Sequence, residues 1–211
     1  MALNSMDQLN AMHFDVLREI GNIGQGNAAS ALSQMLGQAI DIEVPTVKLL
    51  DFNETVEYLG GPENIVLGML VTLKGEIQGM MLYVLQQGFA AKMINAVFGK
   101  EMTDLMTLDE MDMSFIQEIG NILAGSYVNA ISSLTGLTID ISVPTVTVDM
   151  SGAILAVPAV EFAQIGSKVL FIDDSFIFGS QGKSSEIQSN VILVPELDSL
   201  ETLFRRLGVE V

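Results

Sequence analysis

Apolar and polar positions follow a succession of patterns that occurs twice along this chain. Apolar residues with helical spacing predict a long amphipathic helix over residues 7–37, which Gly37 is placed to end. Alternating apolar positions and Gly or Pro breaks predict the other elements of the first half. These are a strand at 40–50, a loop with a helical turn at 51–63, strands at 64–73 and 76–86 around Lys74-Gly75, and a helix at 87–98.

The same order of patterns returns about 100 residues later. It predicts a helix at 109–136, a strand at 138–149, a link with a short helix before Pro158, strands at 168–178 and 187–195 around a polar turn at Gly179 to Ser185, and a helix at 196–207. We therefore expect a pseudo-twofold α+β fold with about six strands in one antiparallel or mixed sheet. The two long helices and the shorter ones would cover a single face. Residues 1–211 would form one domain of two repeats, about 7–99 and 107–208.

A short motif is the clearest sign of the repeat. Glu19-Ile20-Gly21-Asn22 recurs 99 positions later as Glu118-Ile119-Gly120-Asn121, and 16 of the 29 residues from 19 to 47 are identical to their partners. Each copy ends in Val-Pro-Thr-Val, where the proline marks a sheet edge, a bulge or a strand boundary because it cannot donate a ladder hydrogen bond.

The outward side of each long helix carries polar and small residues. Helical geometry places Asp15, Glu19, Asn22, Gly26 and Ala29 within about 80° of one another, and the matching positions are Ser114, Glu118, Asn121, Gly125 and Val128. Glycine inside a helix costs about 1 kcal/mol relative to alanine, so an outward glycine in both copies predicts close approach of another macromolecule. Gly21, Gly24 and Gly120 lie nearer the apolar side and predict tight helix–sheet packing.

Two interpretations of the repeated Glu and Asn remain open from the residues alone. They are either a solvated surface preserved by duplication, or two copies of a site. Neither residue is a good nucleophile, His13 looks like an unpaired residue of the helix surface, and Asp109, Glu110 and Asp112 look like a solvated helix start. No converging His or carboxylates predict a metal site. A carboxamide can position water and a carboxylate can bind a partner's Lys or Arg, so each pair would form half an active site.

Composition narrows the possible partners. The net charge is −17 with nine Lys and Arg, which disfavours nucleic acid and anionic membranes. The chain has no Cys, and its longest apolar stretch is interrupted by charged residues, so neither disulfides nor a membrane span is expected. The first residues lack the basic and apolar segments of a secretory signal. We expect a cytoplasmic protein.

These motifs resemble the CheC/CheX/FliY family of chemotaxis phosphatases, whose pattern is Asp or Ser, three residues, Glu, two residues, Asn, twenty-two residues, Pro. Asp15, Glu19, Asn22 and Pro45 match it, and so do Ser114, Glu118, Asn121 and Pro144. Within the family, a chain of this length that carries two motifs is most similar to CheC. The resemblance implies hydrolysis of the aspartyl phosphate of the response regulator CheY. Glu19 and Glu118 would bind the regulator's lysine, and Asn22 and Asn121 would orient water.

The resemblance also implies further features. Asp15, Ser114, Pro45 and Pro144 would support the site, and Mg²⁺ would belong to CheY, so this chain would bind no cofactor. Gly26 and Gly125 would lie in the docking surface, which is an inference from helix geometry. The deamidase CheD would bind near 149–160, with Asp149, Ile154 and Leu155 as candidate contacts. Tyr127 and Val128 would make the second surface bulkier. A non-catalytic flagellar-switch or CheD-binding adaptor on the same fold is the alternative.

Overall fold

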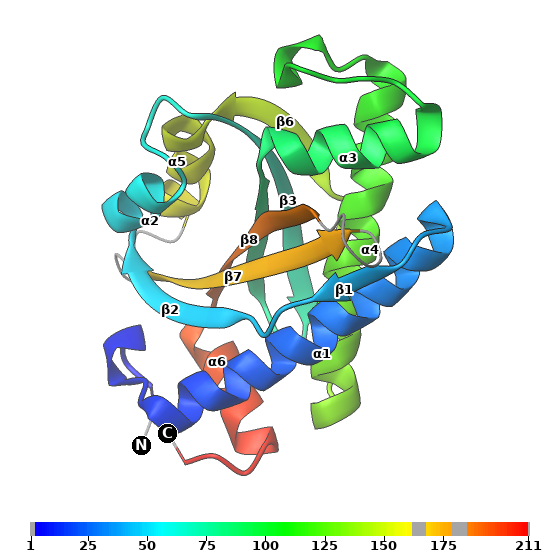
Figure 1. The fold of residues 1–211 in the computed structure, drawn as a ribbon. Helices are drawn as coiled ribbons and strands as arrows, with labels where there is room; N and C mark the ends of the chain where they lie inside the picture. Colours follow the sequence, from blue (N-terminus) through cyan, green and yellow to red (C-terminus); the bar gives the residue numbers. More distant parts are fainter. Residues whose placement is uncertain (1–2, 162–167, 179–184, 211) are drawn as a thin grey trace.

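The computed structural model describes residues 3–161, 168–178 and 185–210 (Figure 1). The described helices are α1 (Ala11–Leu36), α2 (Phe52–Tyr58), α3 (Gln87–Phe98), α4 (Glu110–Thr135), α5 (Ser151–Glu161) and α6 (Leu197–Arg206), with 3-10 turns η1 (Met6–Gln8) and η2 (Leu105–Thr107). The described strands are β1 (Ile40–Ile42), β2 (Thr46–Asp51), β3 (Ile65–Gly75), β4 (Gly79–Leu85), β5 (Ile139–Ile141), β6 (Thr145–Met150), β7 (Lys168–Phe178) and β8 (Ser185–Pro195).

One sheet runs through the described chain with the order β1-β7-β8-β4-β3-β5, while β2 also pairs with β7 and β6 with β3. Every pairing is antiparallel. The α+β class is thus confirmed, and the sheet has six strand positions. The chain forms eight described strands because the strand at each edge position is interrupted by a short break. The two breaks end at Pro45 and Pro144. The polar turn predicted at Gly179 to Ser185 lies, apart from Ser185, outside the described residues.

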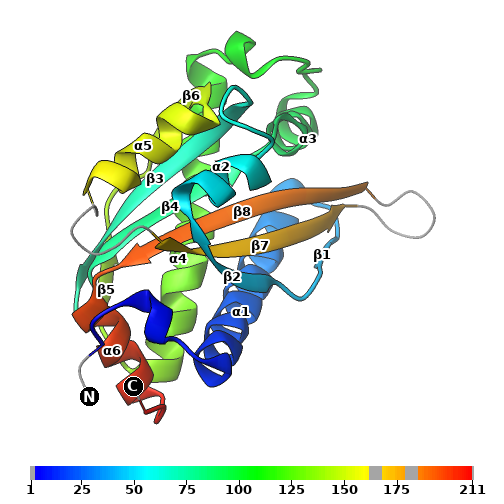
Figure 2. The ribbon, with the colours of Figure 1, turned by 90° about the vertical axis from the view of Figure 1, so that its left-hand side faces the viewer.

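Helices cover both faces of the sheet, which differs from the prediction of a single covered face. The larger apolar core joins the sheet to α1, α3, α4 and α6. A second buried cluster lies on the opposite face, where Leu59, Ile154 and Leu155 of the α2 and α5 regions pack on strand residues such as Phe171 and Ile192. Figure 2 shows α2 and α5 on the side of the sheet that faces the viewer, with α4 behind it. The sequence predicts a loop with a helical turn for the segment containing α2 and a short helix for that containing α5, because both segments are too short for a clear helical period.

The two halves exchange their edge strands. Strand β2 of the first half pairs with β7 of the second, with Thr46 opposite Asp173, and β6 of the second half pairs with β3 of the first, with Thr145 opposite Leu70. The central pairing of β4 with β8 also joins the halves. Neither half completes its part of the sheet without strands from the other.

Caps at both ends set the length of the two long helices. Asn10 and Asp109 accept backbone N–H bonds at the N-termini, and Gly37 and Gly136 adopt left-handed backbone at the C-termini. His13 completes the first cap, because its Nδ1 accepts from the backbone of Asn10.

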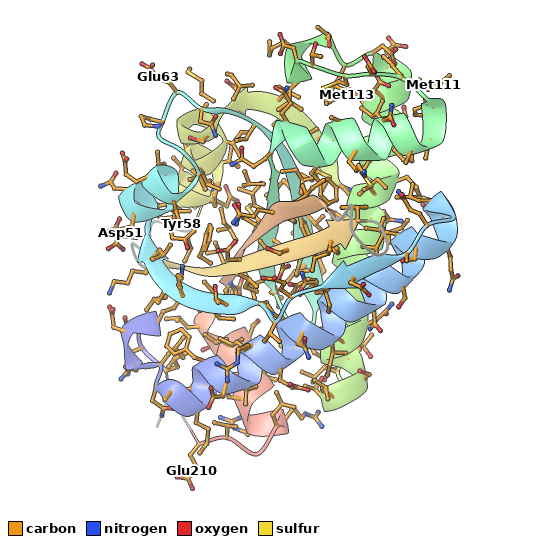
Figure 3. All side chains as sticks on the ribbon, in the orientation of Figure 1. Asp51, Tyr58, Glu63, Met111, Met113 and Glu210 are labelled. Atoms are coloured by element: carbon orange, nitrogen blue, oxygen red, sulfur yellow. The ribbon has the colours of Figure 1, made fainter. Side chains whose placement is uncertain are left out.

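Two residues in the first turns of α1 and α4 are buried, whereas the sequence predicted them at the surface. His13 is buried, not a surface residue: its Nε2 lies 3.0 Å from the carbonyl of Glu210 and its ring lies on Phe204. Figure 3 shows Glu210 near the start of α1. Asp112 is also buried rather than solvated, and it pairs with Lys100. The apolar pattern could not predict either contact, because both partners come from distant parts of the fold or from a loop.

Candidate functional site

Helices α1 and α4 lie against each other on the same face of the sheet (Figure 1). Gly24 makes this contact close, because a Cβ at Gly24 would stand 3.0 Å from Cγ of Tyr127 and 3.1 Å from its Cα. Gly24 therefore allows helix–helix packing, not the helix–sheet packing predicted for it. The two Glu–Asn pairs are carried on helices whose relative position is fixed by this contact.

The first half-site, defined as Glu19 and Asn22, faces away from the core. Glu19 is exposed and Asn22 is half-buried. Within the described residues, no hydrogen bond or ion pair engages either side chain. Asp15, one turn earlier, is paired with Arg18 at 2.8 Å across the exposed surface. The half-site thus presents a carboxylate and a carboxamide whose polar atoms are available to a partner.

The second half-site, defined as Glu118 and Asn121, has the same arrangement with a more open setting. Both side chains are exposed, and in the described part of the chain neither takes part in a hydrogen bond or ion pair. The hydroxyl of Ser114 donates to the carbonyl of Glu110 in its own helix at 2.8 Å, so it carries no ion pair like that of Asp15. The neighbouring Gln117 donates to the carbonyl of Pro144 at 2.6 Å.

A Gly–Pro contact lies beneath each half-site. A Cβ at Gly21 would stand 3.3 Å from Cγ of Pro45, and one at Gly120 would stand 3.4 Å from Cβ of Pro144 and 2.9 Å from the sulfur of Met69. The predicted helix–sheet packing of Gly21 and Gly120 is confirmed. Both prolines are buried. This contact gives the spacing from Asn to Pro a physical meaning: the proline corner of the edge strand supports the helix turn that carries Glu and Asn.

Part of the predicted outward surface is buried between the helices. Ala29 and Val128 have little exposure, and Tyr127 points into the core, so none of the three belongs to the outward surface. The prediction that the second surface is bulkier is therefore wrong. Gly26 lies near Ile42, whose Cδ1 would be 3.8 Å from an added Cβ. At Gly125, no described atom lies within 4 Å of the same position. The second half-site is the less crowded one.

A buried carboxyl beneath the helices escaped the sequence analysis. Asp174 of β7 lies in the core face, and burial raises its pKa to about 7, opposed by the hydrogen bond from Tyr127 and assisted by the charge of Asp173. Nearby, Gln25 of α1 donates to the carbonyl of Ser175 at 2.9 Å. The only sequence signal was the difference between Ala28 and Tyr127 at equivalent positions, which indicates that the second half buries a larger side chain.

The candidate CheD contacts separate into exposed and buried residues. Asp149 is exposed at the end of β6. Ile154 and Leu155 are 5% and 2% exposed because they pack on the sheet, so they are not available to a partner. This corrects the predicted contact. The outward side of α5 instead presents Val157 and Val160, which are 50% and 77% exposed.

The described residues were also compared with the requirements of a metal site and of a membrane span. They contain no group of three or more His, Asp or Glu side chains that could hold a metal ion. Across the same ranges, no helix is both long enough and apolar enough to cross a membrane.

The fold and the two motif helices define an internally duplicated α+β protein that presents two equivalent Glu–Asn surfaces. The CheC-like family matches residues 12–49 and 111–148, the two segments that contain these surfaces. The chain is 38% identical over 92% of its length to the CheY-P phosphatase CheC of Bacillus subtilis (strain 168), of which it covers 93%. The chain belongs to the CheC-like family, which confirms the resemblance inferred from the motifs.

Two further comparisons extend this relationship. The chain is 32% identical over 67% of its length to the flagellar motor switch phosphatase FliY of Bacillus subtilis (strain 168), covering 37% of that protein. The crystal structure of Thermotoga maritima FliY has the same fold, with a TM-score of 0.73 at 24% identity over 95% of this chain and 98% of that one.

Proposed function

We propose that this protein hydrolyses the aspartyl phosphate of the chemotaxis response regulator CheY, using its two half-sites separately. The observation that carries the proposal is the pair of exposed Glu–Asn surfaces, each with its polar atoms free, in a chain similar over nearly its whole length to a CheY-P phosphatase. Solvated scaffold residues would need no repeated Gly–Pro support beneath them.

The chemistry suits a site that lacks a nucleophile of its own. The carboxylate of Glu19 or Glu118 would bind a lysine of the regulator and so fix the two proteins in register. The carboxamide of Asn22 or Asn121 would enter the regulator's site and hold a water molecule in line with phosphorus. Water oxygen bonds to phosphorus as the bond from phosphorus to the aspartyl oxygen breaks. The products are inorganic phosphate and the free carboxylate of the regulator.

Charge compensation for the phosphoryl group would come from the partner. Phosphoryl transfer depends mainly on positioning and on cations around the equatorial oxygens. The chain would need no cofactor of its own, and the Mg²⁺ would arrive with CheY. We place this reaction in the cytoplasm, where the regulator would be phosphorylated.

The remaining motif residues would act through position. Pro45 and Pro144 would hold the edge-strand corner against Gly21 and Gly120, and Asp15 and Ser114 would support the turn before each Glu. Gly26 and Gly125 would leave room for the regulator, because a larger side chain at either position would project from the outward helix surface. Gly26→Leu and Gly125→Leu are therefore expected to weaken CheY binding.

A second partner would bind at another surface, and an alternative function would use the same fold. CheD would bind at Asp149 and the outward side of α5, where Val157 and Val160 expose apolar area. The likeness to FliY, which is named a flagellar motor switch phosphatase, does not separate the two functions. The alternative is a non-catalytic flagellar-switch or CheD-binding adaptor role on the same fold. In that case the Glu–Asn surfaces would bind a partner without hydrolysis.

Phosphate release from phosphorylated CheY tests the proposal. Wild type, Asn22→Ala, Asn121→Ala and the double variant would be compared at equal concentrations, with thermal unfolding as the control for folding. We expect each single variant to retain part of the activity and the double variant to approach the regulator's own rate. A double variant as active as wild type would falsify the positioned-water mechanism, and an inactive wild type that binds CheY would favour the adaptor.

A further inference from the structure

Two pairs of strongly exposed apolar residues occupy equivalent positions in the two repeats. Met12 and Met111 are 61% and 67% exposed, and Val44 and Val143 are 68% and 75% exposed. Each pair is separated by the same 99 positions as the Glu–Asn motifs. Residues beside them differ between the repeats: His13 matches Asp112, and Glu43 matches Ser142. The apolar side chains thus match beside positions that differ, although the Pro and Thr after each valine also match.

Packing does not account for these four side chains, because most of their surface is in solvent. An exposed valine or methionine contributes little to the core, and the free energy gained by burying it becomes available only when a partner covers it. A third equivalent pair, Met35 and Leu134, is only 37% and 41% exposed. Helical geometry places Met35 about 160° from Glu19 around α1, so this pair lies on the other side of the helices.

The two apolar residues of each repeat flank its half-site. Met12 precedes Glu19 by seven residues, so the two side chains lie about 20° apart on one side of α1. Val44 precedes Pro45, whose ring contacts Gly21, and Ile42 of the same corner approaches Gly26. Val44 thus lies on the Asn22 side of the helix. Figure 3 shows the equivalent Met111 at the outer end of α4.

We propose that Met12 and Val44 at the first half-site, and Met111 and Val143 at the second, are specificity-determining contacts that seat apolar side chains of the regulator around its phosphorylated aspartate. This inference rests on the proposed phosphatase function. The occupant is the regulator's phosphorylated face, since the four residues are continuous with the groups that would reach the phosphate. Apolar contacts on two sides of a polar pair exclude bulk water from it, which strengthens the lysine–carboxylate bond.

Such contacts have a kinetic signature different from that of Asn22. They are made equally in the bound complex and in the transition state, so their loss raises KM and leaves kcat unchanged. Loss of the carboxamide lowers kcat. We expect Met12→Ser combined with Val44→Ser to raise KM for phosphorylated CheY about tenfold to a hundredfold, as for loss of two interface anchors.

The experiment isolates one half-site at a time. In a background that combines Glu118→Arg with Asn121→Ala, which removes both binding and hydrolysis at the second half-site, Met12→Ser and Val44→Ser are measured. In a background that combines Glu19→Arg with Asn22→Ala, Met111→Ser and Val143→Ser are measured. Met35→Ser and Ile65→Ser are matched controls, since both alter exposed apolar residues away from the half-sites. Met12→Leu and Val44→Ile should restore affinity, because they keep the apolar surface. Affinity for beryllofluoride-activated CheY is measured in parallel and does not depend on hydrolysis.

A rise in KM and in Kd at either half-site, absent in the controls and reversed by the conservative variants, supports the proposal. Unchanged Kd in both backgrounds overturns it, even where the Asn variants abolish hydrolysis and so support the phosphatase function. If the double Asn variant hydrolyses as well as wild type, the catalytic mechanism fails, while the Kd measurements still decide whether the four residues seat CheY.

Discussion

The hydroxyl of Tyr127 in α4 donates a 2.5 Å hydrogen bond to Oδ2 of Asp174 in β7, and both residues are buried. The other carboxyl oxygen, Oδ1, has no hydrogen-bond partner among the described residues. Burying a charged carboxylate with one oxygen unpaired is costly. The raised pKa of about 7 follows from this cost, since the neutral form is favoured.

Ionisation of Asp174 should therefore lower the free energy of unfolding as the pH rises toward neutrality. Asp174 keeps its proton in the folded protein up to a pKa of about 7 and loses it near 3.8 when unfolded, so its stabilising contribution is complete below 3.8 and disappears through 7. We expect the unfolding free energy of wild type to drop relative to Asp174→Asn by about 2–3 kcal/mol between pH 5 and pH 8. Denaturant titrations of both proteins measure this difference. The contributions of the other acidic residues cancel because both proteins contain them. A difference that does not change with pH would contradict the shifted pKa.

The glycines of the two motif helices should respond oppositely to alanine. Gly24→Ala places Cβ against the backbone of Tyr127, which cannot move aside, so we expect a loss of about 1–2 kcal/mol in unfolding free energy despite better helix propensity. The Cβ of Gly125→Ala would meet no described atom within 4 Å, so this variant should gain about 0.5–1 kcal/mol in unfolding free energy. Chemical denaturation measures both. Equal effects would mean that the α1–α4 contact adjusts freely.

The two half-sites should contribute unequally to hydrolysis. Asn22 is half-buried beside the β1–β2 corner, whereas Asn121 is exposed and no atom of the described residues crowds Gly125. A carboxamide that must enter a partner's site does so more readily from the open position. We expect Asn121→Ala to remove more of the initial rate of phosphate release than Asn22→Ala. The reverse order would show that access to the carboxamide does not limit the rate.

Buried and outward residues of α5 should separate stability from CheD binding. Leu155→Ala removes a side chain that packs on the sheet and should lower the unfolding free energy by about 2–4 kcal/mol. Val157→Asp alters an exposed residue, so we expect stability within about 0.5 kcal/mol of wild type and weaker binding of CheD. Calorimetric titration with CheD tests the second effect. Full affinity of Val157→Asp would place the CheD contact elsewhere.

The sequence predicted what depends on local pattern. Helical spacing located α1 and α4, and the repeat identified both Glu–Asn pairs and the prolines. It misplaced His13 and Ile154, because the carbonyl of Glu210 and the second face of the sheet become their neighbours only in the folded chain. The buried Asp174 was missed for the same reason, since a lone acid in a strand usually faces solvent.

The exchange of edge strands has a consequence for how the chain folds during its synthesis. Strands β1 and β2 have their partner in β7, so Thr46 meets Asp173 only after more than half of the polypeptide has followed it from the ribosome. Until then the N-terminal segment has an unpaired edge, and such long-range pairing slows folding. The first half-site therefore forms late, whereas β5 and β6 beside the second half-site pair with β3, which is already synthesised. A nascent or truncated first half presents Glu19 and Asn22 without the support of the completed sheet.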